Sequence, residues 1–232
     1  MTLLVPRDLP DAIAALQEFE IQRIDYTAPE AGGAIGGVQA GFPLWLASWS
    51  IGKIGAAKSD EVRAWFARRR GGARPFFGRD LTRPFPKAHI AGFAGMTRAG
   101  GGAFDGSATS WSETIDGEDD CRLTLTGLPA GLALGFTDYV GFKWDDPAGA
   151  DGNNYRRALV RVVVGGTASG GGSVTVTVEP PVPALVPAGA VAHLDNPKCV
   201  MKLVTEQSKL DAIDRRLAVR GGTIAGLQDL RS

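Results

Sequence analysis

The sequence predicts a mainly β protein: a β-sandwich-like domain that carries one α-helix, at about residues 59–70, and a second, smaller β-barrel or sandwich domain. Short segments with alternating apolar and polar residues recur along the chain, as in half-buried strands. One segment of the first half has a full set of helix signals. Glycine accounts for 32 of the 232 residues. This is about twice its average frequency and has no collagen-like period, which indicates many turns and short strands.

Two neighbouring strands are expected near the start of the chain. Residues 19–26 begin with the alternation of a half-buried strand, and a glycine-rich turn follows at 32–37. Residues 44–51 place Trp45, Trp49 and two smaller apolar side chains on one face. We therefore expect the tryptophan face of this strand to lie against a core.

The helix is predicted by its two ends and by its apolar stripe. Ser59 is a favoured N-cap residue, and the two acidic residues that follow it are favoured in a first turn. Three arginines precede Gly71, which is typical of a C-terminus. The residues expected in the core between the helix and the strands are Trp45, Trp49, Val62, Trp65 and Phe66.

The middle of the chain predicts a domain boundary. A strand is expected at 75–77, and the prolines that follow exclude a helix until about residue 88. Residues 92–110 are mostly small or polar, which predicts a linker or a long mobile loop. This segment closes a predicted first domain of residues 1–110.

A second β domain is expected at residues 111–199. Its predicted strands are 122–126, 139–144, 157–164 and 174–179. The last two are separated by a glycine-rich turn and should form a hairpin with a long loop. In the C-terminal segment, residues 200–232, a short strand is expected at 200–204 and weak helical spacing runs over 208–217. The sequence leaves open whether this segment returns to the first domain.

Composition and motifs argue against several classes of protein. The 25 basic and 25 acidic residues cancel, so the whole chain lacks the basic excess that drives sequence-independent binding to nucleic acid. Cys121 and Cys199 are too few for a disulfide scaffold and are expected to be reduced thiols in the core. No apolar run is long enough to span a bilayer, and no secretion signal is recognisable, so synthesis in a cytoplasm is expected.

The usual hydrolase, P-loop and dinucleotide motifs are missing from the sequence. His193 and Asp195 could hold a metal from one side of a strand, but a surface turn is the preferred interpretation. The oxygen-rich loop 145–154 lacks the spacing of an EF-hand. The carboxylates at 118–120 could act as paired acid and base groups, although such runs are usually solvated. We therefore expect no enzymatic activity, no cofactor and no metal.

Charge is distributed in two opposite groups along the chain. Residues 63–87 contain eight basic residues and one acid, whereas residues 105–151 contain ten acids and two basic residues. Such poles favour head-to-tail contacts between copies, which can close into rings. A solvated helix end facing an acidic loop within one monomer explains the pattern equally well. The residues assigned to the hypothetical contact are Arg68, Arg69, Arg70, Arg74, Glu118, Asp119 and Asp120.

Residues 57–86 resemble the helix-and-return segment of distal tail proteins from long-tailed phages and gene transfer agents. In that family a short helix rich in arginine and aromatic residues leads through glycine into a Phe-rich strand that ends near Asp, as Phe76, Phe77 and Asp80 do here. The segments 125–131, 137–141 and 174–181 are similar to those of phage tail-tip proteins. Thr137 departs from that pattern, because glycine is expected there.

The resemblance implies an architectural protein of the virion. It would form a homohexameric ring at the tail tip, would join the tail tube protein to the baseplate hub protein, and would let DNA pass through the ring without specific binding. The ring would be built from the first domain, with the second domain outside it. A carbohydrate-binding β-sandwich for adhesion to the host surface is the alternative. Its stacking residues would be Trp111, Tyr139, Trp144 and Tyr155.

Overall fold

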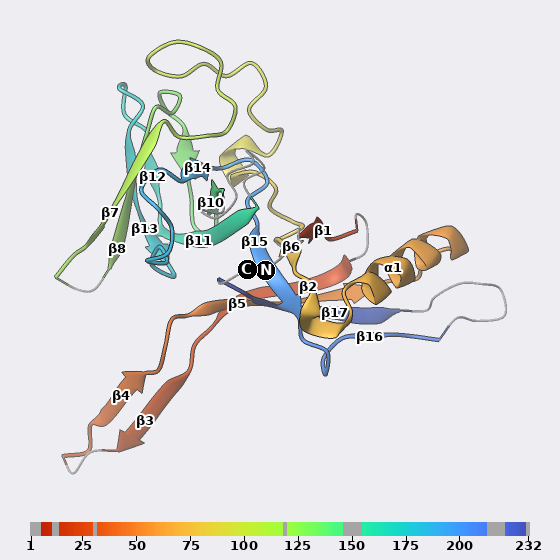
Figure 1. Ribbon diagram of the computed structural model, residues 1–232. Coiled ribbons are helices and arrows are strands. Elements are labelled where there is room, and N and C mark those ends of the chain that lie inside the picture. The colour runs from red at the N-terminus through yellow and green to blue at the C-terminus, as the bar shows by residue number, and fades with distance from the viewer. Residues whose placement is uncertain are drawn as a thin grey trace.

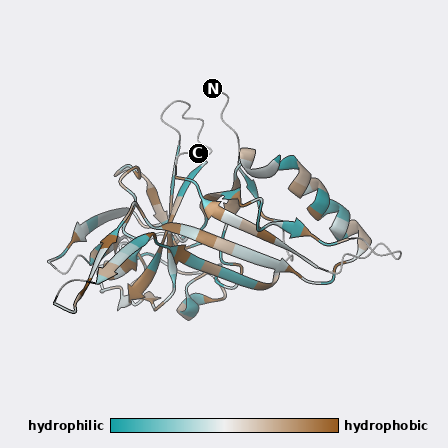
Figure 2. Ribbon diagram, turned by 90° about the horizontal axis from the view of Figure 1, so that it is seen from below, coloured by the Kyte–Doolittle hydropathy of each residue, from teal (hydrophilic) through white to brown (hydrophobic). Residues whose placement is uncertain are grey.

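The computed structural model confirms a mainly β protein with one α-helix in the part of the chain that it describes (Figure 1). The described residues are 6–10, 14–29, 32–117, 120–145, 155–212 and 221–230. Their strands form two large sheets and two small two-stranded ones. Figure 2 shows apolar and polar residues alternating along the strands, as the sequence predicts for sheets with one buried face.

The first sheet contains strands from both ends of the sequence. Its order is β1 (Arg7–Asp8), β6 (Phe76–Gly78), β15 (Cys199–Leu203), β17 (Gly222–Gln228), β5 (Leu44–Ile51) and β2 (Ala14–Gln22), with β16 (Lys209–Leu210) beside β17. All pairs are antiparallel except β1 and β6. Because β17 lies between β5 and β15, this part of the C-terminal segment occupies the middle of the sheet. Both edge strands, β1 and β2, come from the N-terminal part of the chain.

The predicted strand at 44–51 is confirmed with the same bounds and the same buried face. Trp45, Ala47, Trp49 and Ile51 are buried, while the residues between them are half-exposed. The predicted neighbour is β2, and Phe19 on it lies opposite Ala47. The expected helix at 208–217 is not seen at its start, where Lys209–Leu210 form β16; residues 213–217 lie outside the described residues.

The helix α1 (Ala56–Arg68) begins one turn earlier than predicted. Gly55 is its N-cap, so Ser59 lies inside the helix and is 1% exposed. Ser59 does not cap the helix, because the preceding Ala-Ala-Lys residues are themselves good helix formers and extend it towards the N-terminus. Val62 and Trp65 are buried in the first core and Phe66 packs against it half-buried, as predicted.

The second sheet has six antiparallel strands. Its order is β14 (Val191–His193), β10 (Tyr139–Trp144), β11 (Arg156–Val164), β13 (Val174–Glu179), β8 (Cys121–Thr126) and β7 (Ser110–Ile115). The four strands predicted from the sequence are present, and the hairpin of β11 with β13 is confirmed. The short strands β9 (Ala133–Leu134) and β12 (Gly166–Thr167) form a small sheet beside it. The cysteines are confirmed as free, buried thiols.

The linker predicted at 92–110 is wrong, because this segment packs against the second sheet. Phe93 and Phe104 are buried in the core of that sheet, with their ring centroids 5.0 Å apart. The backbone is also bonded to the sheet, since Leu194 N donates to Gly106 O at 2.8 Å. Short side chains dominate the segment, but two aromatic anchors and its backbone hydrogen bonds order it.

The two sheets meet at an aromatic joint. The indole Nε1 of Trp45 on β5 donates to Leu159 O on β11 at 2.7 Å. Tyr139 on β10 contacts Trp45 edge-on, with ring centroids 5.7 Å apart, and also contacts Phe19 at 6.0 Å. Tyr139 and Leu159 therefore belong to the core of the first sheet, although their strands belong to the second. This joint ties the two sheets together.

Candidate assembly surfaces

A hairpin arm projects from the body of the molecule (Figure 1). It is formed by β3 (Asp25–Pro29) and β4 (Ile35–Gln39), which pair only with each other among the described strands. Because paired residues of a hairpin share a face, one face carries Tyr26 opposite Val38 and Ala28 opposite Gly36. The opposite face is mixed and includes Asp25, Thr27 and Gln39. One face is therefore made of apolar and small residues, while the opposite face combines polar residues with Pro29 and the exposed Ile35.

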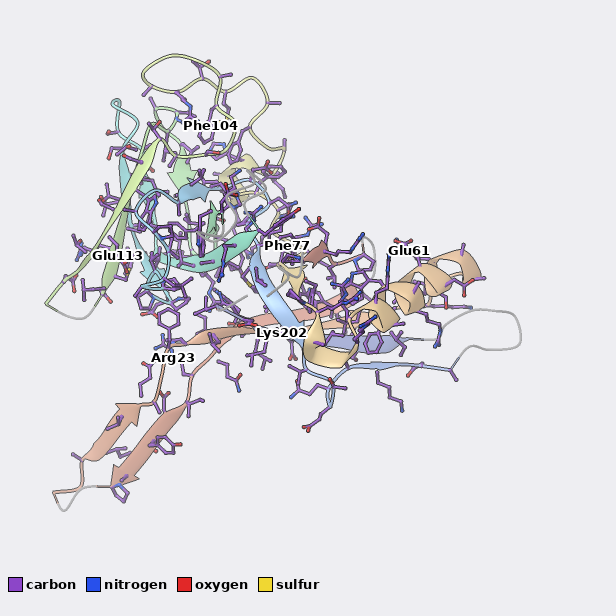
Figure 3. The ribbon with its side chains drawn as sticks, in the orientation of Figure 1. Arg23, Glu61, Phe77, Phe104, Glu113 and Lys202 are labelled. Carbon is purple, nitrogen blue, oxygen red and sulfur yellow. The ribbon has the colours of Figure 1, made fainter. Side chains whose placement is uncertain are left out.

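That apolar face is open to solvent. Tyr26 and Val38 are 68% and 69% exposed, and Ile24 at the base of the arm is 57% exposed. Arg23 lies at the base of the arm (Figure 3). It forms an ion pair with Glu179 of the second sheet at 2.5 Å. Contiguous exposed apolar side chains on a projecting element are typical of interaction sites. Sequence reasoning interpreted this region as a strand and a turn and missed the arm, although residues 24, 26 and 28 alternate as a strand face would.

The predicted arginine group at the end of α1 divides into two kinds of residue. Arg68 and Arg70 are exposed and Arg74 is half-buried, and no described carboxylate pairs with any of the three. Arg69 is only 2% exposed, which contradicts its assignment to a contact with another copy. Its Nη1 donates to Pro75 O at 2.5 Å, and its guanidinium lies 5.3 Å from the ring centre of Trp65. Arg69 therefore holds the turn after the helix.

Several acidic residues of the 105–151 segment already form ion pairs or hydrogen bonds within their own chain. Asp105 pairs with Arg98 at 2.8 Å, and a backbone hydrogen bond from Ser107 lowers the pKa of Asp105. Asp138 is buried and accepts hydrogen bonds from the backbone of Lys87 and Gly135. Glu113 accepts hydrogen bonds from Cys121 Sγ and from Val182 N.

The predicted acceptors at 118–120 are only partly visible. Asp120 is half-buried at the turn between β7 and β8, where its backbone N bonds to Asp116 Oδ1 at 3.1 Å. Glu118 and Asp119, like residues 146–154 of the oxygen-rich loop, lie outside the described residues. Of the predicted acceptors, only Asp120 can be compared, and it forms no ion pair with the described arginines at the end of α1.

The aromatic residues of the carbohydrate-binding alternative do not form a platform. Tyr139 and Trp144 are 5% and 7% exposed, because Tyr139 fills the joint and Trp144 belongs to the second core. Trp111 is half-buried against Phe142, and its Nε1 donates to Ala190 O at 2.8 Å. Tyr155, the fourth residue of the set, is half-buried. This alternative needs the four rings exposed on one face, which is not how the structure places them.

His193 is a buried residue of β14 rather than part of a surface turn. Its pKa is lowered from the ordinary value of 6.5 to about 3, mainly by burial; the hydrogen bond to Asp195 O raises it, and the charges of Lys143, Arg157 and Lys198 lower it. Its Nδ1 bonds to Asp195 O at 2.9 Å, while Nε2 has no partner. His193 therefore stays neutral at physiological pH. Within the described residues, no three His, Cys, Asp or Glu side chains gather as metal ligands would.

The depressed pKa of His193 predicts an acid-sensitive fold. The unfolded chain binds the imidazole proton below about pH 6.5 whereas the folded chain does not, so this contribution to stability is complete above pH 6.5 and is lost as pH falls towards 3. The expected loss is about 1.4 kcal/mol per pH unit from this group. Urea denaturation between pH 7 and pH 4 should show a shallower pH dependence in His193→Asn. Equal slopes in the two proteins would contradict the prediction.

No family model matches the chain, and no curated protein matches it. No helix in the described part of the chain is long and apolar enough to cross a membrane.

Proposed function

We propose that the protein is a structural subunit of a virion: a distal tail protein that forms a homohexameric ring at the tail tip and joins the tail tube protein to the baseplate hub protein. Its role would be architectural rather than enzymatic. The resemblance of residues 57–86 supplies the family, and the hairpin arm is the observation that supports an assembling subunit. A second copy of the chain is the proposed occupant of the arm's apolar face.

The arm supports this proposal because its apolar face stays exposed to water in a single chain and would be buried only by a neighbouring molecule. Tyr26, Val38 and Ile24 are all more than half exposed on an element that pairs with no other described strand. A neighbouring copy would remove these side chains from water at about 25 cal/mol per Å². The backbone edges of the arm would also be available for pairing with a strand of that copy.

Unpaired charge gives a second, weaker support. Arg68 and Arg70 on the first sheet's side have no described carboxylate partner, whereas most described acids of the second sheet are already bonded. Charged contacts between copies would therefore steer assembly, and the arm would supply the larger part of its free energy. Head-to-tail contacts that use two different surfaces close into a ring when the rotation between copies permits it.

The test is the solution mass by light scattering, across protein concentration and from low salt to about 0.5 M, where surface charges are strongly screened. We expect a hexamer, or a concentration-dependent series that ends in one, with salt weakening association without abolishing it. The measurement is repeated with the tail tube protein added, because a ring can require the tube as a template for its assembly. A strict monomer at every concentration, with the tube protein present as well, would contradict the proposal.

A further inference from the structure

A groove lies between the N-terminal residues 6–10 and the side of α1. It has a volume of about 700 Å³ and ends at the last turn of the helix. Trp65 forms part of its wall and donates its indole Nε1 hydrogen to Asp8 O at 2.9 Å, which ties the two walls together. Leu9 and Pro10 add apolar surface beside the charged groups. The groove is thus wide enough for a chain segment and is apolar along part of its length.

The arginines of the groove have no described counterion. Arg7, Arg68 and Arg69 line it. The two acids on its rim are occupied by lysines, since Asp8 pairs with Lys198 at 2.6 Å and Glu61 pairs with Lys58 at 2.9 Å. Within the described residues, none of the three arginines forms an ion pair. Positive charge therefore collects in the groove without compensation.

Arg69 makes this excess charge costly. Arg69 is only 2% exposed to solvent, and its Nε has no hydrogen-bond partner. Burial lowers its pKa, and the charges of Arg7, Arg74 and Arg68 lower it further. A buried cation surrounded by like charges is unfavourable unless an anion approaches it. Guanidinium groups bind carboxylates in a two-pronged geometry, which suits several arginines around one acidic group.

We propose that this groove binds an acidic peptide segment, with a carboxylate held between the exposed Arg7 and Arg68, beside the buried charge of Arg69, and with neighbouring side chains against Leu9, Pro10 and Trp65. The size of the groove and its apolar walls favour a peptide over a small free anion. The site needs no ring, so it does not depend on the function proposed above.

The test is a calorimetric titration of the full chain with the peptide acetyl-Gly-Glu-Asp-Asp-Gly-amide. The matched control peptide has Gln and Asn in place of the acids, and inorganic phosphate serves as the small-anion control. We expect the acidic peptide to bind, the neutral peptide not to bind, and phosphate to bind more weakly than the acidic peptide. Binding should fall as salt rises to about 0.5 M. Equal binding of the neutral peptide, or phosphate binding as tightly as the acidic peptide, would overturn the proposal.

Two exposed arginines permit variants that leave the fold intact. Arg7→Gln combined with Arg68→Gln should weaken peptide binding about tenfold or more, because each removes a charge-assisted contact. Arg70→Gln combined with Arg74→Gln is the matched control, since it removes the same number of charges and neither residue lines the groove. We expect it to change affinity less than about twofold. The same loss in both proteins would assign the effect to general charge and refute the site. Thermal unfolding of each variant verifies that the fold is retained.

Discussion

Replacement of Trp45 by Ala is expected to lower the free energy of unfolding by about 3 to 5 kcal/mol, as for other large buried aromatic residues. Trp45 is fully buried and stacks on Phe19, with ring centroids 5.1 Å apart. Its indole nitrogen also provides the hydrogen bond to Leu159 O across the joint. The variant therefore loses packing on both sides of the joint and one buried hydrogen bond. Urea denaturation followed by circular dichroism measures the change.

The position of Trp45 predicts how the variant unfolds as well as how much stability it loses. Because the joint couples the two sheets, the first sheet should unfold at lower urea than the second in Trp45→Ala, whereas the original chain should unfold in one transition. Leu16→Ala on β2 is the control, since Leu16 is 75% exposed and the change should stay within about 0.5 kcal/mol. A loss below about 1 kcal/mol in Trp45→Ala would contradict a structural role for this residue at the joint.

The strands that sequence reasoning identified are those with a strong local pattern. In β5 every second residue is apolar and buried, so both its bounds and its core face follow from the two-residue period of a strand. The strands β8, β10, β11 and β13 could be predicted because they are rich in residues with high β propensity.

The strand β17 was not predicted, because its glycines have a role that only the folded chain reveals. It contains Gly222 and Gly226, and glycine is a turn signal when only the sequence is considered. In the sheet, a Cβ at Gly226 would lie 2.7 Å from the ring of Phe76. The small residue is therefore required by a strand that is distant in sequence. The ordered segment 92–110 was missed likewise, because its contacts are to other strands.

The spacing of residues along α1 could have predicted which arginines at its end face solvent. Val62, Trp65 and Arg69 are spaced by three and four residues, so they share one stripe of the helix and its first C-terminal turn. This spacing predicts that Arg69 alone faces inward while Arg68 and Arg70 face solvent, as observed. The hairpin arm is different, because alternation predicts its strands but cannot indicate that both of its faces lack cover. That information exists only in three dimensions.

Introduction of charge on the apolar face of the arm, with Tyr26→Glu and Val38→Glu, is expected to abolish self-association while leaving the protomer as stable as before. Both side chains are about two-thirds exposed in one chain, so their replacement should change the free energy of unfolding by less than about 1 kcal/mol. In an assembly, the same carboxylates would have to be buried without partners, which costs several kcal/mol for each contact. Light scattering should then give the monomer mass at concentrations where the original chain associates.

The opposite face of the same arm provides the control that separates this effect from general repulsion. Thr27→Glu and Gln39→Glu add the same two charges to the same two strands, but on the mixed face. We expect this variant to associate nearly as the original chain does, with a stronger dependence on salt because added surface charge is screened by ions. Loss of association in both variants would indicate that negative charge on the arm is unfavourable wherever it lies. Association of both would show that the apolar face is not an interface, because no interface that excludes water tolerates two unpaired carboxylates at its centre.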